Sequence, residues 1–213
     1  MKKLVILGAG GHGRELLEWV YDINRVSPEW EFLGFLDDDP HALDGENCRY
    51  GVIGAPDSWD GYGDAFVALG VADPKTKEKV CVHLREKGAS FASIIHPSAR
   101  IAENAVIGEG FVAYPDSFVC SNARVGDFVS LLSSKISHDC VIGDYCTILS
   151  YVGLNGNTTL GKRVFIGNHA AMVQGLTIGD DVSIGIGSVV IKDIPSGTHV
   201  FGNPARPIRT ASE

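Results

Sequence analysis

The sequence has few aromatic residues, few basic residues and no long apolar run. Aromatic residues make up 8% of the 213 residues, and 18 Lys and Arg stand against 26 Asp and Glu, which gives a formal net charge of −8. Binding to nucleic acid depends on clustered Lys and Arg that neutralise phosphates, so we exclude nucleic acid as a partner. No apolar run approaches the ~18 residues of a membrane-spanning helix, so we expect no membrane insertion.

Cysteine is also scarce, with five residues and no CxxC spacing. We therefore expect free thiols in a reducing, cytoplasmic environment. No group of His, Cys, Asp and Glu has the spacing of metal ligands, so we expect no metal. The first residues, MKKLVILGAGGHGRE, hold only a short apolar run before glycines and charges, and we interpret this run as a strand rather than a targeting segment.

The first 93 residues alternate between apolar strands and amphipathic helices. The pattern predicts strands at 3–10, 31–39 and 65–70, and helices at 13–24 and 74–88. Alternating strands and helices are typical of a parallel α/β sheet. We therefore predict a Rossmann-like α/β half domain over residues 1–93.

From Ile95 onward the chain repeats every six residues, and each hexad begins with an apolar residue, its head. The heads are Ile95, Ile101, Ile107, Ala113, Val119, Val125, Leu131, Ile136, Ile142, Ile148, Leu154, Leu160, Ile166, Met172, Ile178, Ile184 and Val190. A six-residue period indicates a parallel β-helix, in which each hexad forms one strand and one turn and three hexads form a triangular coil. We predict about five coils between residues 95 and 193, with the heads in the core.

Two details of the repeat carry further predictions. The step from Leu131 to Ile136 is one residue short, so one turn should be shorter than the others. Glycine follows seven of the heads, and we predict that these glycines occupy corners of positive φ. They are Gly108, Gly126, Gly143, Gly161, Gly167, Gly179 and Gly185.

A glycine loop, GAGGHG at 8–13, lies between the first predicted strand and the first predicted helix. Such glycines let the backbone approach a phosphate, and the helix N-terminus supplies N–H donors. Asp37, Asp38 and Asp39 lie at the end of the second predicted strand, about where nucleotide-binding βαβ units place a ribose-binding acid. A domain this short holds little more than one such unit, so a mononucleotide or nucleotide sugar fits better than NAD. The alternative is a tight turn without a ligand.

One hexad carries a titratable pair, His138 and Asp139, in the stretch KISHDCVIGDYCTI at 135–148. Neither residue is a head, so packing of the core does not require them. A neutral imidazole can accept the proton that an amine loses when it attacks a thioester, and a nearby carboxylate stabilises the resulting imidazolium. The alternative is an exposed corner histidine followed by a turn-forming aspartate.

The order of these features resembles the sialic-acid O-acetyltransferase family of bacterial sugar acetyltransferases. The resemblance rests on the glycine-loop domain, IIHPSARI at 94–101, the hexads, HDCVIGD at 138–144 and GNPARPI at 202–208. The family includes enzymes that N-acetylate nucleotide-linked 4-amino-4,6-dideoxy sugars. The resemblance implies a left-handed β-helix over 94–193, a C-terminal tail over 194–213, and a homotrimer with active sites between subunits.

The resemblance also implies roles for single residues. His138 is the general base, and Asp139 orients it or raises its basicity. The nucleotide sugar is held by Gly10, Gly11, His12, Gly13, Asp37 and Asp38. The cosubstrate acetyl-CoA is bound near Thr147, Asn168, Ile186, Pro204 and Arg206. The family's pattern differs from this chain at Leu131, Thr147 and Tyr151.

We therefore predict an acetyl-CoA-dependent N-acetyltransferase. Its acceptor is the amino group of a UDP-, dTDP- or GDP-linked amino sugar used in surface polysaccharide or glycan biosynthesis. One alternative is O-acetylation of a sugar hydroxyl, as in sialic acid. A second is a non-catalytic trimer that binds a nucleotide sugar, which CoA would not stabilise.

Overall fold

The computed structural model describes residues 1–208. The chain divides into two compact units, Met1–Pro97 and Ser98–Glu213, close to the predicted boundary after residue 93. The end of the predicted tail, 209–213, lies outside the described residues. Over the part of the chain that the structure describes, no helix has both the length and the apolar character needed to cross a membrane.

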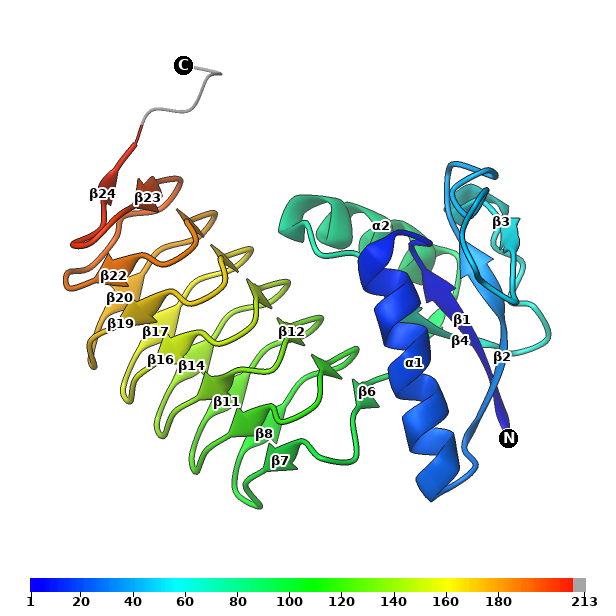
Figure 1. Ribbon diagram of the computed structural model, residues 1–213, viewed down its shortest axis with the longest axis horizontal. Coiled ribbons are helices and arrows are strands. Elements are labelled where there is room, and N and C mark those ends of the chain that lie inside the picture. The colour runs from blue at the N-terminus through cyan, green and yellow to red at the C-terminus, as the bar shows by residue number, and fades with distance from the viewer. Residues whose placement is uncertain (209–213) are drawn as a thin grey trace. The chain divides into compact units, whose positions relative to one another are not determined.

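The first unit is built on a five-stranded parallel sheet with the order β3-β2-β1-β4-β5 (Figure 1). Its elements are β1 (Lys2–Leu7), α1 (Gly11–Val26), β2 (Trp30–Leu36), β3 (Val52–Gly54), the 3-10 helix η1 (Pro56–Ser58), β4 (Phe66–Leu69), α2 (Pro74–Glu86), β5 (Ser90–Phe91) and β6 (Ile94–Ile95). The three predicted strands and both predicted helices are present. Strands β3 and β5 were not predicted, because strands of three and two residues are too short to show a period.

The second unit is a triangular β-solenoid in which each coil has three two-residue strands (Figure 1). Face 1 consists of β7 (Arg100–Ile101), β10 (Phe118–Val119), β13 (Lys135–Ile136), β16 (Gly153–Leu154), β19 (Ala171–Met172) and β22 (Val189–Val190). Face 2 consists of β8 (Val106–Ile107), β11 (Arg124–Val125), β14 (Val141–Ile142), β17 (Thr159–Leu160) and β20 (Thr177–Ile178). Face 3 includes β9 (Val112–Ala113), β12 (Ser130–Leu131), β15 (Thr147–Ile148), β18 (Phe165–Ile166), β21 (Ser183–Ile184), β23 (His199–Phe201) and the antiparallel β24 (Arg206–Pro207).

Fourteen of the 17 hexad heads, from Ala113 onward, form the core of the solenoid, as the six-residue period predicts, whereas the first three, Ile95, Ile101 and Ile107, are only partly buried. Every head from Ala113 to Val190 is at most 4% exposed. The short step is also confirmed, because β10 pairs Phe118 with Lys135 while β13 pairs Lys135 with Gly153. The turn 132–134 is therefore one residue shorter than the other turns, and the strands in the coils above and below it stay aligned.

The predicted reason for the glycines after the heads is wrong. All seven lie within the described residues, and none of them has φ in the left-handed region. A Cβ on Gly143 would lie 2.5 Å from the backbone carbonyl of Gly161 in the next coil, so these positions are glycine because the coils stack too closely for a side chain. Positive φ instead occurs two residues later in the same turns, at Phe128, Tyr145 and Arg163.

Candidate functional site

His138 and Asp139 lie in a turn between face 1 and face 2. We call this edge of the solenoid the histidine corner, and its turns are 102–105, 120–123, 137–140, 155–158 and 173–176. Nδ1 of His138 lies 2.8 Å from Oδ2 of Asp139, and the two side chains are 57% and 43% exposed. A carboxylate only accepts hydrogen bonds, so Nδ1 carries a proton, and in the neutral ring Nε2 then holds the lone pair.

Asp139 is held in its ionised form by two donors. The hydrogen bond from His138 is the larger cause that lowers the pKa of Asp139, and the hydrogen bond from Asn122 is the next. Asn122 Nδ2 lies 3.0 Å from Oδ1 of Asp139, so each carboxylate oxygen has its own partner. The pair therefore presents a histidine whose ring position and tautomer are set by a carboxylate.

Gly156, one coil further along, lies against the imidazole of His138. A Cβ on this glycine would be 2.5 Å from Cε1 and 2.7 Å from Nε2 of the ring. The ring thus packs on bare backbone on one side and is hydrogen-bonded to Asp139 at its edge. Beside it, a surface pocket of about 350 Å³ is lined by Asn104, Val106, Asn122, Arg124, Asp139 and Val141.

The residues predicted to bind acetyl-CoA lie elsewhere on the solenoid. Thr147 belongs to β15 on face 3. Asn168 and Ile186 lie in turns between face 3 and face 1, an edge that we call the third corner, where the carbonyl of Asn168 accepts the N–H of Gly187 at 2.9 Å. In the same corner Tyr151 stacks on His169 with ring centroids 5.0 Å apart. Within one chain, these residues and His138 therefore occupy different edges.

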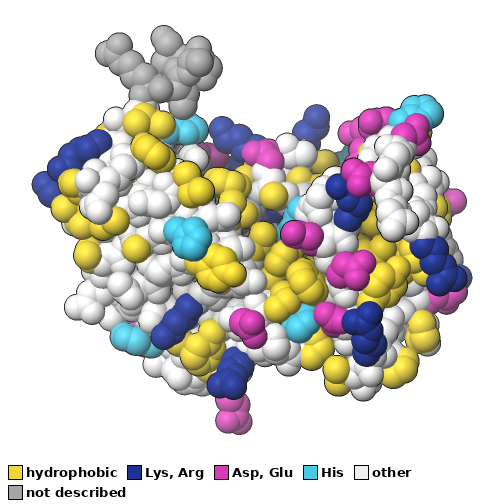
Figure 2. Space-filling model, in the orientation of Figure 1, with side chains coloured by type: hydrophobic (Ala, Val, Ile, Leu, Met, Phe, Trp, Pro, Cys, Tyr) yellow, Lys and Arg dark blue, Asp and Glu magenta, His cyan; other side chains and the backbone are white. Residues whose placement is uncertain are grey.

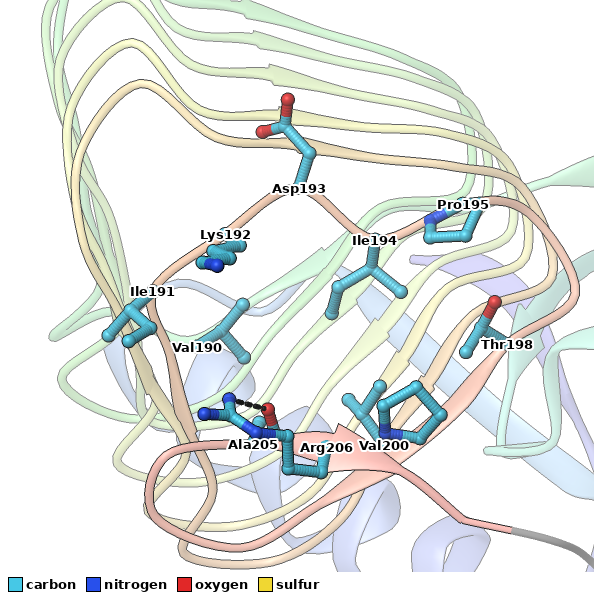
Figure 3. A pocket seen from close by; sticks show the side chains of 11 residues that line it. Val190, Ile191, Lys192, Asp193, Ile194, Pro195, Thr198, Val200, Ala205 and Arg206 are labelled. Atoms are coloured by element: carbon cyan, nitrogen blue, oxygen red, sulfur yellow. Dashed lines mark hydrogen bonds between the residues drawn. The ribbon is translucent and has the colours of Figure 1, made fainter.

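The tail folds back on the last coil and closes a pocket of about 330 Å³ (Figure 3). Val190, Ile194 and Val200 give it an apolar lining. Among its charged residues, Lys192 and Arg206 are positive and Asp193 is negative. Arg206 Nη1 donates to the carbonyl of Ala205 at 3.0 Å. Pro204 lies in the turn just before β24, so the predicted tail residues Pro204 and Arg206 are neighbours at this end of the solenoid.

The glycine loop of the first unit has two kinds of glycine. A Cβ on Gly13 would lie 1.9 Å from the carbonyl oxygen of Gly8, and one on Gly70 would lie 2.6 Å from Cα of Gly13. These positions allow α1 to pack tightly on the strand ends. A Cβ on Gly10 or Gly11 would have no neighbouring atom within 4 Å, so the backbone of these two glycines is accessible to a ligand.

The acids after β2 also differ from one another. Oδ2 of Asp37 accepts the N–H of Ala9 at 2.8 Å, and Oδ1 accepts the N–H of Asp39 at 3.0 Å. Asp37 thus ties the glycine loop to the end of β2. Asp38 is exposed and lines a pocket of about 400 Å³ with residues of η1 and α2. The carboxylate of Asp38 is therefore more accessible to a ligand than that of Asp37, which is partly buried.

His12 lies in the first turn of α1. Burial, and as the second cause the charge of Lys77 on α2, lower the pKa of His12 to about 4. His12 is therefore neutral near pH 7 and brings no positive charge to the loop. The helix itself supplies the attraction for an anion, since α1, all of it described, has no acid in its first turn and no side-chain N-cap.

Two residues of the site were missed in the sequence, Asn122 and Gly156. Both were detectable from the period of the coil, because Asn122 precedes Asp139 by 17 residues across the short step, and Gly156 follows His138 by one 18-residue coil. Stacking one coil on the next brings such positions together. His138 and Asp139 are recognisable as a pair because they are adjacent in the sequence, whereas Asn122 and Gly156 are close to them only in space.

Other classes of site receive no support from the surface. On the face drawn in Figure 2, Lys and Arg are interspersed with Asp and Glu and form no continuous basic patch, in keeping with the net charge of −8. Within residues 1–208 there is no group of three or more His, Cys, Asp and Glu that could hold a metal ion.

Comparison with known proteins decides the family. Residues 3–84 match the PglD N-terminal domain, and residues 139–174 match the bacterial transferase hexapeptide repeat. The acetyltransferase domain of PglB from Neisseria gonorrhoeae FA1090, solved in complex with acetyl coenzyme A, is 30% identical, with a TM-score of 0.86 over 97% of this chain and 99% of that chain. The chain belongs to this family of hexapeptide-repeat acetyltransferases. Its solenoid is accordingly a left-handed β-helix, as the resemblance implied.

Two further relatives of this acetyltransferase have named substrates. PerB from Caulobacter crescentus, solved in complex with CoA and GDP-perosamine, is 26% identical, with a TM-score of 0.81 over 98% of each chain. GDP-perosamine N-acetyltransferase from Escherichia coli O157:H7 is 29% identical over 96% of this chain and 95% of its own length. The similarity therefore extends through both units and includes proteins that bind a nucleotide-linked amino sugar.

Proposed function

We propose that this acetyltransferase transfers the acetyl group of acetyl-CoA to the amino group of a nucleotide-linked amino sugar, with His138 as the general base. The observation that carries the proposal is the 2.8 Å contact between Nδ1 of His138 and Asp139, which leaves Nε2 as the proton acceptor. The substrates of the PerB and PglB relatives support the choice of donor and acceptor.

The reaction needs no covalent enzyme intermediate. The amine attacks the thioester carbonyl, a C–N bond forms, and Nε2 of His138 takes the proton that the nitrogen loses. Asp139 stabilises the imidazolium. The tetrahedral intermediate then breaks its C–S bond, and the departing thiolate takes the proton from His138. The products are the N-acetyl sugar and CoA, and the imidazole returns to its starting form.

The first unit is proposed to hold the nucleotide. A diphosphate at Gly10 and Gly11 would meet open backbone N–H groups at the N-terminus of α1. Neutral His12 would serve as a hydrogen-bonding group rather than a counter-charge. Asp38 has the exposed carboxylate that could accept ribose hydroxyls. The product would be a building block for surface glycans.

Acetyl-CoA is proposed to lie between two copies of the chain. Asn168 and Ile186 occupy the third corner and His138 the histidine corner, and we propose that one donor molecule reaches both groups by lying between neighbouring subunits. Exposed Val106 and Val141 flank the histidine corner and would be covered by a neighbour. The positive charge of Lys192 and Arg206 suits the phosphates of CoA. These features favour the homotrimer implied by the resemblance.

A thiol-release assay with acetyl-CoA and a panel of acceptors tests the proposal. The panel contains UDP-, dTDP- and GDP-linked 4-amino sugars together with free sialic acid. We expect CoA release with at least one nucleotide-linked amino sugar. Turnover with sialic acid alone would show an O-acetyltransferase. Turnover with none of them at high enzyme concentration, in a protein whose melting temperature acetyl-CoA leaves unchanged, would indicate a binding module.

Gly156→Ala is expected to lower kcat by roughly tenfold to a hundredfold. The added methyl group would occupy the space of the His138 ring, which lies 2.5 Å from the position of that Cβ, and would push Nε2 out of line with the acceptor. Steady-state kinetics with the acceptor found above measures the effect.

Gly153→Ala provides the matched control for this variant. It lies three residues earlier in the same coil, and its Cβ would make an ordinary contact at 3.5 Å with Cβ of Ala171. We expect kcat close to that of the wild type. Equal losses in the two variants would show that any methyl group in this coil disturbs the enzyme, and the specific packing of Gly156 on His138 would then be unimportant.

A further inference from the structure

Three polar side chains are stacked along the histidine corner, one in each successive coil. Asn104 Nδ2 lies 2.8 Å from Oδ1 of Asn122, and Asn122 Nδ2 lies 3.0 Å from Oδ1 of Asp139. The backbone N–H of Asn122 also donates to Oδ1 of Asn104 at 3.3 Å. All three side chains are exposed, so packing does not hold them in place. Their hydrogen bonds to one another do.

The chemistry of the groups gives this ladder a direction. An ionised Asp139 can only accept, so Asn122 must turn its NH2 group toward it and its carbonyl oxygen away. That oxygen then faces Asn104, which must donate to it. Asn104 in turn uses its own oxygen to accept the backbone N–H of Asn122. In this orientation each side chain makes its hydrogen bonds, whereas a flipped Asn122 amide would place acceptor against acceptor at Asp139 and donor against donor at Asn104.

We infer that Asn122, oriented by Asn104, is a positioning residue that reserves one oxygen of Asp139 for itself and leaves the other for Nδ1–H of His138. The inference rests on the proposed role of His138 as the base. With Oδ1 occupied by Asn122, the carboxylate cannot rotate to place both oxygens elsewhere, and Oδ2 stays 2.8 Å from the ring. The ladder thereby keeps the lone pair on Nε2.

Single substitutions give the first test. Asn122→Ala should lower kcat about fivefold with little change in either KM, because the carboxylate loses one restraint while its charge remains. Asn104→Ala should have a smaller effect in the same direction. Asp139→Asn should lower kcat roughly thirtyfold, since Asn122 then draws the amide oxygen to itself and turns the NH2 group toward Nδ1. His138 would then adopt the Nε2–H tautomer, and Nε2 could no longer accept the proton of the amine.

The double variant gives a result that a merely structural residue would not. In the Asp139→Asn background, removing Asn122 frees the new amide to flip, so that its oxygen can accept Nδ1–H again. Asn122→Ala should therefore lower kcat in the wild type but raise it about threefold in Asp139→Asn. The tautomer of His138, read from its ¹⁵N chemical shifts in the free enzyme, should be Nδ1–H in the wild type, Nε2–H in Asp139→Asn, and partly Nδ1–H in the double variant.

Asn157→Ala is the control. Asn157 lies in the same corner with φ of 59°, close to the 60° of Asn122, so both substitutions place alanine in the same unfavourable backbone conformation. Its N–H donates to the carbonyl of His138, a backbone contact that alanine keeps. We expect the wild-type tautomer and kcat.

Two results would overturn the inference. One is an Asn122→Ala enzyme whose kcat equals that of Asn157→Ala. The other is a double variant whose losses simply add. The ¹⁵N measurement needs no substrate, so it separates this inference from the proposed function. If no acceptor in the panel is acetylated but the tautomers are as expected, the proposed reaction is wrong and the inference about Asn122 stands. If the enzyme is active but all variants have the wild-type tautomer, the inference is wrong and the proposed reaction stands.

Discussion

His138→Asn is expected to lower kcat by about 10³-fold and to leave the KM for acetyl-CoA within about twofold. Asparagine has a similar reach and polarity but cannot take up a proton near neutral pH. The amine would then lose its proton to water, which is present at no fixed position. Because the ring lies on the surface and supports no core packing, the fold should be unaffected.

The measurement is steady-state kinetics, with His41→Asn as the control. His41 also has Nδ1 close to a carboxylate, 3.0 Å from Oδ2 of Asp44, and it is exposed in the first unit. We expect kcat of this control to match the wild type. A loss of less than about tenfold would show that His138 is not the base.

Much of the second unit could be predicted from sequence because its structure is one rule repeated. An apolar head every six residues determines which side chains face the core, and the coil of 18 residues determines which positions stack. The short step at Leu131 to Ile136 appeared in the sequence and in the register alike. In the first unit the longer strands and both helices were predicted, while β3 and β5 are too short to carry a periodic signal.

The reasons behind particular residues were harder to predict than the elements. Glycine after seven of the heads suggested positive φ there, yet in these turns the structure gives positive φ to residues such as Tyr145 and Arg163. The seven glycines instead lie where a Cβ would come within 3 Å of the next coil. A sequence shows that a side chain is missing but not whether a backbone angle or a neighbouring coil excludes it. Similarly, Asp37 was predicted as a ligand for the nucleotide sugar, and the sequence did not show its structural role, in which its two oxygens accept the N–H groups of Ala9 and Asp39.

The glycine loop supports the last prediction. Gly13→Ala is expected to destabilise the first unit by more than about 3 kcal/mol. Its Cβ would lie 1.9 Å from the carbonyl oxygen of Gly8, which is backbone and cannot rotate away. Gly8 is itself fixed, because its N–H donates to the carbonyl of Leu36 at 2.7 Å. Helix α1 would have to move off the sheet to make room.

Denaturant unfolding followed by tryptophan fluorescence measures this effect in the relevant unit, because Trp19, Trp30 and Trp59 are the three tryptophans of the chain and all lie in it. The matched variant is Gly11→Ala, whose Cβ would have nothing within 4 Å. We expect it to keep the wild-type unfolding midpoint and to raise the KM for the nucleotide sugar instead, since its methyl group would stand where a phosphate approaches the N-terminus of α1. The same motif would then contain one glycine required by packing and one required by the ligand. If Gly13→Ala unfolded like the wild type and only raised that KM, both glycines would serve the ligand, and the close approach of α1 to β1 would not be what requires glycine at this position.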